Sequence, residues 1–395
     1  MNPDLTRLHS YPFEKLAELK SGITPPADRP HISLSIGEPK HPAPEFALAA
    51  IRDNLDLLSN YPVTGGTPAM REAAASWASN RYQLSHLNAS QVIPVNGTRE
   101  ALFAIAQAVV DRSQQPIVMM PNPFYQIYEG AALLAGAEPY YLNCTAEQGY
   151  LPDYQQVPEA VWQRCQLLYL CNPGNPTGAV MPAEQLRELI ELADRYDFVI
   201  ASDECYSEIH FEQPPTGLLT VCEELGRHDY RRCVVFQSLS KRSNLPGLRS
   251  GFVAGDQAII TPFLHYRTYH GCAMPLTIQA ASSLVWQDET HVAANRALYA
   301  QKFAQVLPVL QTVLAVQKPD AAFFLWAKTP IDDQAFAREL FAAENVTVLP
   351  GSYLARTAQG TNPGVNHVRM ALVAEVEECL EAAHRIQRFV QGLAQ

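Results

Sequence analysis

The sequence has few basic side chains, and they form no cluster. Its 395 residues include 29 lysines and arginines against 40 aspartates and glutamates, for a formal net charge of -11. A nucleic-acid surface needs the opposite balance, because much of its affinity comes from lysine and arginine contacts to phosphates. The composition therefore argues against a nucleic-acid-binding protein, and against a transcription regulator among them.

Long apolar runs are also missing. No stretch approaches the roughly 18 apolar residues that a membrane-spanning helix needs, and the first residues, Met1–Asp4, are not a basic segment leading into an apolar one. The pattern of a secretory signal is therefore absent there. We expect a cytoplasmic protein without a membrane partner.

The eight cysteines form no C-x-x-C pair, and no cysteine–histidine set has the spacing of a zinc site. Several lie in apolar runs, where a thiol behaves as a small core residue. We expect reduced, mostly structural cysteines and no metal site.

What the chain does have is a series of short apolar runs separated by helical patterns. In the helical pattern after the third run, Leu186, Leu189, Ile190 and Ala193 fall at the spacing of one helix face. Strands without polar alternation, separated by helices, are typical of a parallel sheet covered on both faces. The sequence therefore predicts an α/β fold with a mostly parallel sheet, whose strands lie near residues 92–95, 117–120, 167–170, 198–201 and 233–236.

The last third has a different pattern. Helical spacing runs from about Pro275 to Val316 and from about Ala374 to Val390, and strand candidates lie between at 323–326, 346–349 and 367–370. This arrangement predicts a second, smaller α+β domain, on which the proline-rich N-terminal segment packs. We expect residues 45–285 to form the large domain, and residues 1–44 with 286–395 to form the small one.

Polar motifs follow several of the predicted strands, and ligands bind at the carboxyl ends of parallel strands. Lys241 lies between Ser238 and Arg242 after one strand, with Arg249 eight residues on. Asp203 and Tyr206 follow another strand, and Asn175 lies in the turn-rich stretch 172–178. Together these groups suit an aldehyde cofactor that carries a phosphate and a ring nitrogen.

Each of these residues also has a simpler interpretation. Lys241 could be a surface lysine in a turn or a lysine that forms a Schiff base. Asp203 could cap a helix or hold a proton on a ring nitrogen, with Tyr206 donating to a ring oxygen. Tyr125 and Tyr61 could be core residues, or Tyr125 could stack on a flat ring.

Asn96–Arg99 joins a strand to a helix, where backbone N–H groups bind phosphate without needing a particular side chain. The motif is neither G-x-G-x-x-G nor a Walker loop, so neither a dinucleotide nor a nucleoside triphosphate is indicated. Arg369 lies inside an apolar run, where an unpaired guanidinium would cost several kcal/mol. It should therefore meet a carboxylate, either of the protein or of a substrate.

Taken together and in this order, these residues resemble the class I and II aminotransferases of the aspartate aminotransferase superfamily. The resemblance extends from Gly37 to Arg369. It implies pyridoxal 5'-phosphate (PLP) as cofactor and fold type I, with a mostly parallel seven-stranded sheet in the large domain and a smaller α+β domain. It also implies amino-acid and 2-oxo-acid substrates and a homodimer with shared active sites.

The same resemblance assigns roles to single positions. Lys241 would bond to the cofactor and move the proton, and Asp203 would hold the pyridine nitrogen. Arg99 departs from the small residue of many members, so only its backbone N–H is carried over. The other implied roles are partners of the ring oxygen (Tyr206, Asn175), ring stacking (Tyr125), phosphate binding (Gly97, Thr98, Arg99, Ser238, Ser240, Arg249, and Tyr61 from the neighbouring subunit) and substrate binding (Arg369, Gly37, Asn175).

Residues 240–251, 266–275 and 350–356 more narrowly resemble the N-succinyldiaminopimelate aminotransferases of bacterial lysine biosynthesis. This resemblance predicts transfer from L-glutamate to N-succinyl-2-amino-6-oxopimelate. An aminotransferase for alanine or aromatic amino acids and a PLP-dependent C–S lyase remain as alternatives. Arg267, Tyr269 and His270 could bind the distal end of the substrate or form a surface segment.

Overall fold

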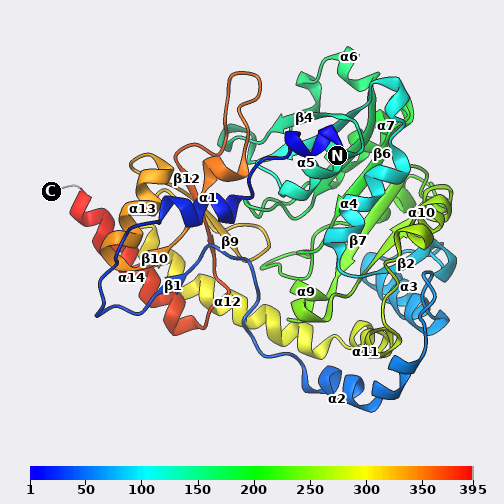
Figure 1. The fold of residues 1–395 in the computed structure, drawn as a ribbon, viewed down its shortest axis with the longest axis horizontal. Coiled ribbons are helices and arrows are strands. Elements are labelled where there is room, and N and C mark those ends of the chain that lie inside the picture. The colour runs from blue at the N-terminus through cyan, green and yellow to red at the C-terminus, as the bar shows by residue number, and fades with distance from the viewer. Residues whose placement is uncertain (394–395) are drawn as a thin grey trace.

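A seven-stranded sheet organises the larger part of the molecule in the computed structural model, which describes residues 1–393 (Figure 1). Its order is β2-β8-β7-β6-β5-β3-β4, and every neighbouring pair is parallel except those that involve β8. The expected mostly parallel sheet is confirmed. Its strands are β2 (Val92–Val95), β3 (Ile117–Asn122), β4 (Glu138–Asn143), β5 (Cys165–Cys171), β6 (Val199–Asp203), β7 (Cys233–Ser238) and β8 (Gly251–Gly255).

Alternate strand residues enter two separate cores, one on each face of this sheet. One face is covered by α4 (Thr98–Val109), α5 (Gln126–Leu134) and α10 (Gln257–His270). The other is covered by α3 (Pro68–Tyr82), α7 (Ala183–Tyr196), α8 (Leu218–Glu224) and α11 (Leu276–Gln287), with α2 (Glu45–Asp53) on α11 and the short α6 (Glu159–Trp162) nearby. In α7 the predicted apolar stripe is buried, while Glu184 in its first turn and Arg195 in its last turn match the helix dipole.

The smaller part has its own core and two small sheets (Figure 1). The order β11-β12-β9 forms an antiparallel sheet from Leu349–Pro350, His367–Ala371 and Phe324–Lys328. A parallel pair joins β1 (Ile32–Ser33) to β10 (Val346–Thr347). The helices are α12 (Thr290–Leu310), α13 (Asp333–Glu344) and α14 (Val376–Leu393).

The N-terminal segment contacts both parts. Helix α1 (Pro12–Leu19) packs on β11, and β1 pairs with β10, in line with the expected packing on the smaller part. Residues 3–7 instead lie beside α5 of the large sheet layer. The domain boundaries near residues 45 and 285 stay a prediction.

The helical spacing from Pro275 to Val316 belongs to two helices, because α11 ends at Gln287 and α12 begins at Thr290. The break is held by polar contacts: the Asp288 side chain accepts from the backbone N–H of His291 at 3.0 Å, and Arg242 donates to the Asp288 carbonyl at 3.0 Å. Among residues 1–393, no helix is long and apolar enough to cross a membrane. The cytoplasmic location stays a prediction.

Candidate active site

A cleft of about 410 Å³ opens at the carboxyl ends of β5, β6 and β7, where α/β sheets bind ligands. Every residue to which the family resemblance assigned a role lines this cleft, except Gly97 and Tyr61. The smaller part of the molecule contributes Phe324, Leu354 and Arg369, and the N-terminal segment contributes Tyr11, Pro12 and Phe13. The structure thus joins segments that are hundreds of residues apart in the sequence.

Lys241 enters the cleft from α9 (Leu239–Arg242), the short helix that follows β7. Its Nζ donates to the carbonyl oxygen of Gly37. Burial lowers the pKa of Lys241 from 10.5 to about 8, and the nearby guanidinium groups of Arg369 and Arg249 act in the same direction. About a tenth of this amine is therefore uncharged at pH 7, against less than a thousandth at the ordinary pKa of 10.5, and the uncharged form is the one that a nucleophilic lysine requires.

Asp203, the last residue of β6, is buried at the bottom of the cleft. Tyr128 donates its hydroxyl to Oδ2 at 2.8 Å, and the backbone N–H of Cys205 donates to Oδ1 at 3.3 Å. Burial raises the pKa of Asp203, while these hydrogen bonds and the nearby Lys241 oppose the rise. The carboxylate is thus fixed in position and could accept a proton-bearing ring nitrogen.

Arg369, in β12, presents a guanidinium that is 5% exposed. It donates to Asn175 Oδ1 at 3.0 Å and to the Ser35 carbonyl at 2.7 Å, and it lies over the ring of Phe324. Its buried Nε has no partner among the described residues, and burial lowers its pKa to about 10. The sequence predicted that Arg369 meets a carboxylate, either of the protein or of a substrate. No carboxylate of residues 1–393 pairs with it, which leaves the substrate carboxylate as the expected partner.

Tyr206 is buried next to Arg369, against the rings of Phe323 and Phe324. Burial raises the pKa of its hydroxyl, so this group is protonated and can donate a hydrogen bond. Asn175 lies on the loop after β5 and is linked to Arg369 by the bond described above. Both side chains line the same cleft as Asp203 and Arg369.

The opposite end of the cleft is built for an anion. Helix α4 begins at Thr98 after Gly97, so backbone N–H groups of its first turn lie there without helical partners. Gly97 has φ +78°, and a Cβ at this position would lie 2.1 Å from Nη2 of Arg249. Only glycine allows this close approach. Ser238 caps α9 and accepts from the Ser240 N–H at 3.1 Å, which places both serines beside Lys241.

Tyr125 ends the loop after β3, and its ring packs edge-on against Tyr128 at 5.8 Å. Its hydroxyl accepts from Nε of Arg99 at 2.7 Å. Nη2 of the same arginine donates to the hydroxyl of Tyr11 at 2.7 Å. The Arg99 side chain, for which the sequence comparison predicted only a backbone role, is therefore part of the cleft wall.

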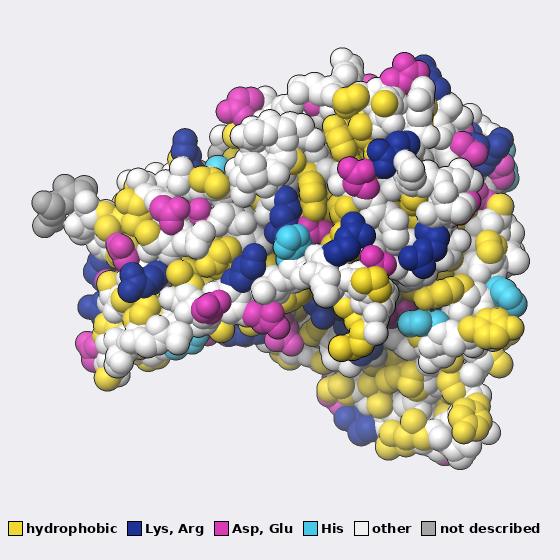
Figure 2. Space-filling view, turned by 45° about the horizontal axis from the view of Figure 1, so that its top comes forward, with side chains coloured by type: hydrophobic (Ala, Val, Ile, Leu, Met, Phe, Trp, Pro, Cys, Tyr) yellow, Lys and Arg dark blue, Asp and Glu magenta, His cyan; other side chains and the backbone are white. Residues whose placement is uncertain are grey.

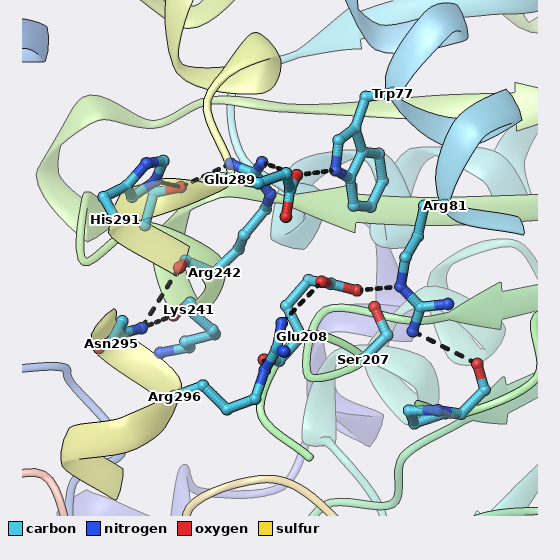
Figure 3. A network of polar contacts seen from close by, with 12 residues as sticks. Trp77, Arg81, Ser207, Glu208, Lys241, Arg242, Glu289, His291, Asn295 and Arg296 are labelled. Atoms are coloured by element: carbon cyan, nitrogen blue, oxygen red, sulfur yellow. Dashed lines mark hydrogen bonds and ion pairs between the residues drawn. The ribbon is translucent and has the colours of Figure 1, made fainter. Parts of the chain in front are cut away.

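A polar network holds the backbone at Lys241 and Arg242 (Figure 3). Asn295 of α12 donates to the carbonyls of Lys241 and Arg242, both at 3.2 Å. Arg242 is 2% exposed, pairs with Glu289 at 2.6 Å and lies over the rings of Trp77 and Trp286. The position of Lys241 therefore depends on α3, α11 and α12 as well as on α9.

The structure separates three candidates from the cleft. Tyr61 is fully exposed and lies outside the cleft of its own chain. Arg267 is fully buried and makes two bonds to Glu100, at 2.8 and 2.7 Å, so its guanidinium is not free for a substrate. Tyr269 is 84% exposed, and none of these three residues lines the cleft.

The sequence analysis missed Tyr11, Tyr128 and Asn295. Tyr128 could have been noticed, because it follows Tyr125 by three residues and so shares a helix face with it. Tyr11 and Asn295 carried no signal, since their contacts depend on packing between distant segments. Two groups of side chains among residues 1–393 are close enough to hold a metal, but neither lines the cleft: His86, Glu223 and His228, and Glu100, His270 and Cys272.

A partly buried lysine, a buried carboxylate, an anion-binding helix start and a buried arginine in one cleft define an enzyme that holds a phosphorylated aldehyde cofactor beside a carboxylate-bearing substrate. The family model for class I and II aminotransferases matches residues 29–386, and the chain belongs to this family. The expected aspartate-aminotransferase-type fold is confirmed.

Among solved structures, an aminotransferase from Neisseria meningitidis is 47% identical with a TM-score of 0.94, and the match covers 98% of this chain and 99% of that one. A probable aminotransferase of Mycobacterium tuberculosis is 32% identical over 386 residues, 95% of this chain and 84% of the relative. An LL-diaminopimelate aminotransferase of Dehalococcoides mccartyi is 28% identical over 367 residues, 91% of each chain.

The family is PLP-dependent, and the cleft fits this cofactor. Lys241 offers the amine for the aldehyde, and Asp203 offers a fixed carboxylate for the ring nitrogen. Because Gly97 has no Cβ, the guanidinium of Arg249 lies against the start of α4, where a phosphate would be held.

Proposed function

We propose that this aminotransferase moves an amino group between L-glutamate and N-succinyl-2-amino-6-oxopimelate, a step of bacterial lysine biosynthesis. The sequence strings at 240–251, 266–275 and 350–356 support this substrate. The relative from Dehalococcoides mccartyi supports diaminopimelate chemistry in general and supplies the main rival substrate, LL-diaminopimelate.

The observation that carries the proposal is the charge of the cleft. Its charged lining residues are Arg99, Lys241, Arg249 and Arg369 against a single carboxylate, Asp203. The far end of N-succinyl-2-amino-6-oxopimelate carries only carboxylates and an amide, whereas the far end of LL-diaminopimelate also carries an ammonium group. A cation-rich cleft favours the succinylated compound, because opposite charges attract and like charges cost free energy. Alanine and aromatic substrates would leave one cation without a partner.

PLP, when bound, supplies an electron sink for the bond that breaks at the substrate α-carbon. In our proposal, Lys241 Nζ takes the proton from this carbon and returns it in the opposite half-reaction. Arg369 holds the substrate α-carboxylate through its free donors, and Asn175 orients Arg369. Asp203 keeps the ring nitrogen protonated, with Tyr128 holding the carboxylate in place.

A half-reaction assay on the PLP-loaded protein tests this proposal. L-Glutamate, N-succinyl-LL-diaminopimelate, LL-diaminopimelate, L-alanine, an aromatic amino acid and cystathionine are each added alone, and the 2-oxo product is measured by mass spectrometry. We expect rapid product from the first two and little from the others, and none from the Lys241→Ala variant with any of them. Reaction only with alanine or aromatics would contradict the substrate. Pyruvate from cystathionine without amino transfer would identify a C–S lyase instead.

We also propose that the active form is a homodimer in which Tyr61 completes the partner's cleft. Tyr61 is fully exposed, and Leu55, Leu58, Val63 and Leu284 are each at least half exposed. Figure 2 shows apolar side chains gathered over the lower right lobe, which carries α2 and α11. An apolar surface of this kind is typical of an interface between copies.

A further inference from the structure

The segment 35–41 runs along the cleft and contacts two of its cations. The carbonyl of Ser35 accepts from Arg369 at 2.7 Å, and the carbonyl of Gly37 accepts from Nζ of Lys241. One end of the segment is fixed by β1, which pairs with β10. Residues 36–43 make no hydrogen bond between backbone groups, within the part of the chain that the structure describes. The other end of the segment therefore depends on side-chain contacts.

The side chain that holds this end is His41, which is 6% exposed and whose Nδ1 lies 2.9 Å from Oδ1 of Asn295. Asn295 uses its Nδ2 to donate to the carbonyls of Lys241 and Arg242 (Figure 3). His41 and the Lys241 backbone are thus bonded to the same side chain. Gly37, on the same segment as His41, contacts Nζ, so the series of contacts that begins at the Lys241 backbone returns to its amine.

The hydrogen positions in this series follow from the partners. Because Nδ2 of Asn295 donates to two carbonyls, its Oδ1 accepts, and Nδ1 of His41 carries the hydrogen. Nε2 of His41 is then an acceptor, and it lies 2.6 Å from Nζ of Lys302. Burial lowers the pKa of His41 from its ordinary value of 6.5, which keeps the ring in this neutral form.

Lys302, in α12, is fully buried, which is costly for an ammonium group. Among residues 1–393 its hydrogen-bond partners are His41 and the carbonyl of Val373 at 3.2 Å, and neither is a carboxylate. The proposed reaction gives this lysine no role. A donor in this place holds the His41 ring in the tautomer that can donate to Asn295.

We propose that His41, supported by Lys302, is a positioning residue for Lys241. It ties the 35–41 segment to Asn295 and so fixes the Gly37 carbonyl to which the Lys241 amine donates. The inference rests on the role proposed for Lys241, the amine that bonds to PLP and moves the proton, and not on the choice of substrate. A lysine held in one place exchanges a proton with the reacting carbon faster than one that must be re-oriented in each cycle.

The main test variant is the double substitution His41→Leu/Lys302→Met. It replaces the polar pair by apolar side chains of similar size and leaves no buried charge unpaired. His41→Asn is the rescue variant, because its amide nitrogen can donate to Asn295 as Nδ1 does. Lys40→Ala is the matched control, since Lys40 lies on the same segment and its ion pair with Glu378, at 3.9 Å, is exposed on both sides.

Two measurements are made on each variant. In the first, PLP is added to the cofactor-free protein, and the absorbance change gives the rate at which the Lys241 amine condenses with the aldehyde and releases water. In the second, single turnovers of the PLP-loaded protein are followed with L-glutamate and with L-glutamate deuterated at its α-carbon. They give the limiting rate constant, the half-saturating concentration and the isotope effect on proton transfer. Circular dichroism shows whether each variant is folded.

We expect the double variant to slow PLP capture and to lower the limiting rate constant by about tenfold to a hundredfold, because the amine is misplaced. The isotope effect should rise, since proton transfer becomes the slower step. The half-saturating concentration should stay within about threefold, because Arg369 is unaltered. His41→Asn should recover part of both rates, and Lys40→Ala should match the unaltered protein within about twofold. If the double variant does not fold, Lys302→Met is measured instead, with a smaller slowing of both rates expected.

Unchanged PLP capture and an unchanged isotope effect in the folded variant would overturn the inference, since packing alone would then hold Lys241. A loss confined to the half-saturating concentration would overturn it as well, because the 35–41 segment would then act on the substrate through Arg369. If Lys241→Ala captures PLP as fast as the unaltered protein, the role proposed for Lys241 fails. If the unaltered enzyme captures PLP but does not react with glutamate, the proposed function fails, and the capture rates still decide the role of His41.

Discussion

Lys241 must be a reactive amine at a pH where an ordinary lysine is protonated. An amine that attacks an aldehyde must be uncharged, yet an ordinary lysine with a pKa of 10.5 is almost entirely protonated at pH 7. The surroundings of Lys241 solve this by burial and by two nearby arginines, which lower its pKa to about 8. The same arginines bind anions, so the residues that recognise the cofactor and substrate also activate the lysine.

This pKa gives a prediction about pH. Since the uncharged amine is the reactive form and the folded pKa lies below the ordinary value, capture of PLP by the cofactor-free protein should speed up as pH rises towards 8 and level off above it. The rate is followed by the absorbance change on mixing at several pH values between 6 and 11. A rate that keeps rising to a midpoint near 10.5 would mean that burial does not activate Lys241.

At the residue scale, the sequence located most of the cleft lining, because single side chains such as Lys241, Asp203 and Arg369 follow or interrupt apolar runs. It could not give their partners. Tyr128 on Asp203 and Tyr11 on Arg99 are contacts between segments far apart in the chain. It also placed Arg267 among possible substrate ligands, although packing pairs that residue with Glu100.

At the element scale, the strands that the sequence identified are buried on both faces, which leaves an uninterrupted apolar run. The two that it did not identify have shorter apolar runs, although β8 is itself buried throughout. Strand β4 forms the sheet edge and has mostly half-exposed residues, and β8 is bounded by Gly251 and Gly255. The antiparallel direction of β8 could not be predicted, because it depends on how the chain connects the strands and not on the local sequence of β8.

The junction of α9, α11 and α12 depends on the pair of Arg242 and Glu289, and it yields a prediction about stability. Glu289→Ala would leave a buried guanidinium without its carboxylate and Trp77 Nε1 without its acceptor. Because Glu289 is 58% exposed, water would compensate in part, and we expect a loss of about 2 kcal/mol in the free energy of unfolding. Thermal unfolding monitored by calorimetry measures it.

Glu45→Ala is the matched control, since the ion pair of Glu45 with Arg52 is more than half exposed on both sides and such pairs contribute little. We expect its unfolding temperature to stay near that of the unaltered protein. Equal effects of the two substitutions would show that the buried network does not stabilise the position of Lys241.

At the scale of the whole molecule, the proposed dimer makes a prediction that a monomeric site cannot reproduce. Lys241→Ala and Tyr61→Ala should each have little activity alone. If Tyr61 acts in the partner's cleft, a mixed dimer contains one intact site, with Lys241 from one subunit and Tyr61 from the other. Unfolding and refolding an equal mixture should restore about a quarter of the full activity, because half of the dimers are mixed and each has one intact site of two. No recovery would place Tyr61 outside the partner's site.

The large sheet and the membership of the aminotransferase family were within reach of the sequence, because they rest on local patterns and on motif order. The substrate was not, since it depends on how distant segments share one cleft. Arg99, Tyr11 and Arg369 come from three different parts of the chain, and only the folded structure places them around the same space.

The most direct test of this account is the ratio of kcat/KM for N-succinyl-LL-diaminopimelate and LL-diaminopimelate, with 2-oxoglutarate as acceptor. With Lys241 and Arg249 engaged by the cofactor, the cleft offers Arg99 and Arg369 to the substrate. This predicts a ratio of at least about a hundred in favour of the succinylated compound, which lacks the distal ammonium group. A ratio near one, or a preference for LL-diaminopimelate, would contradict it.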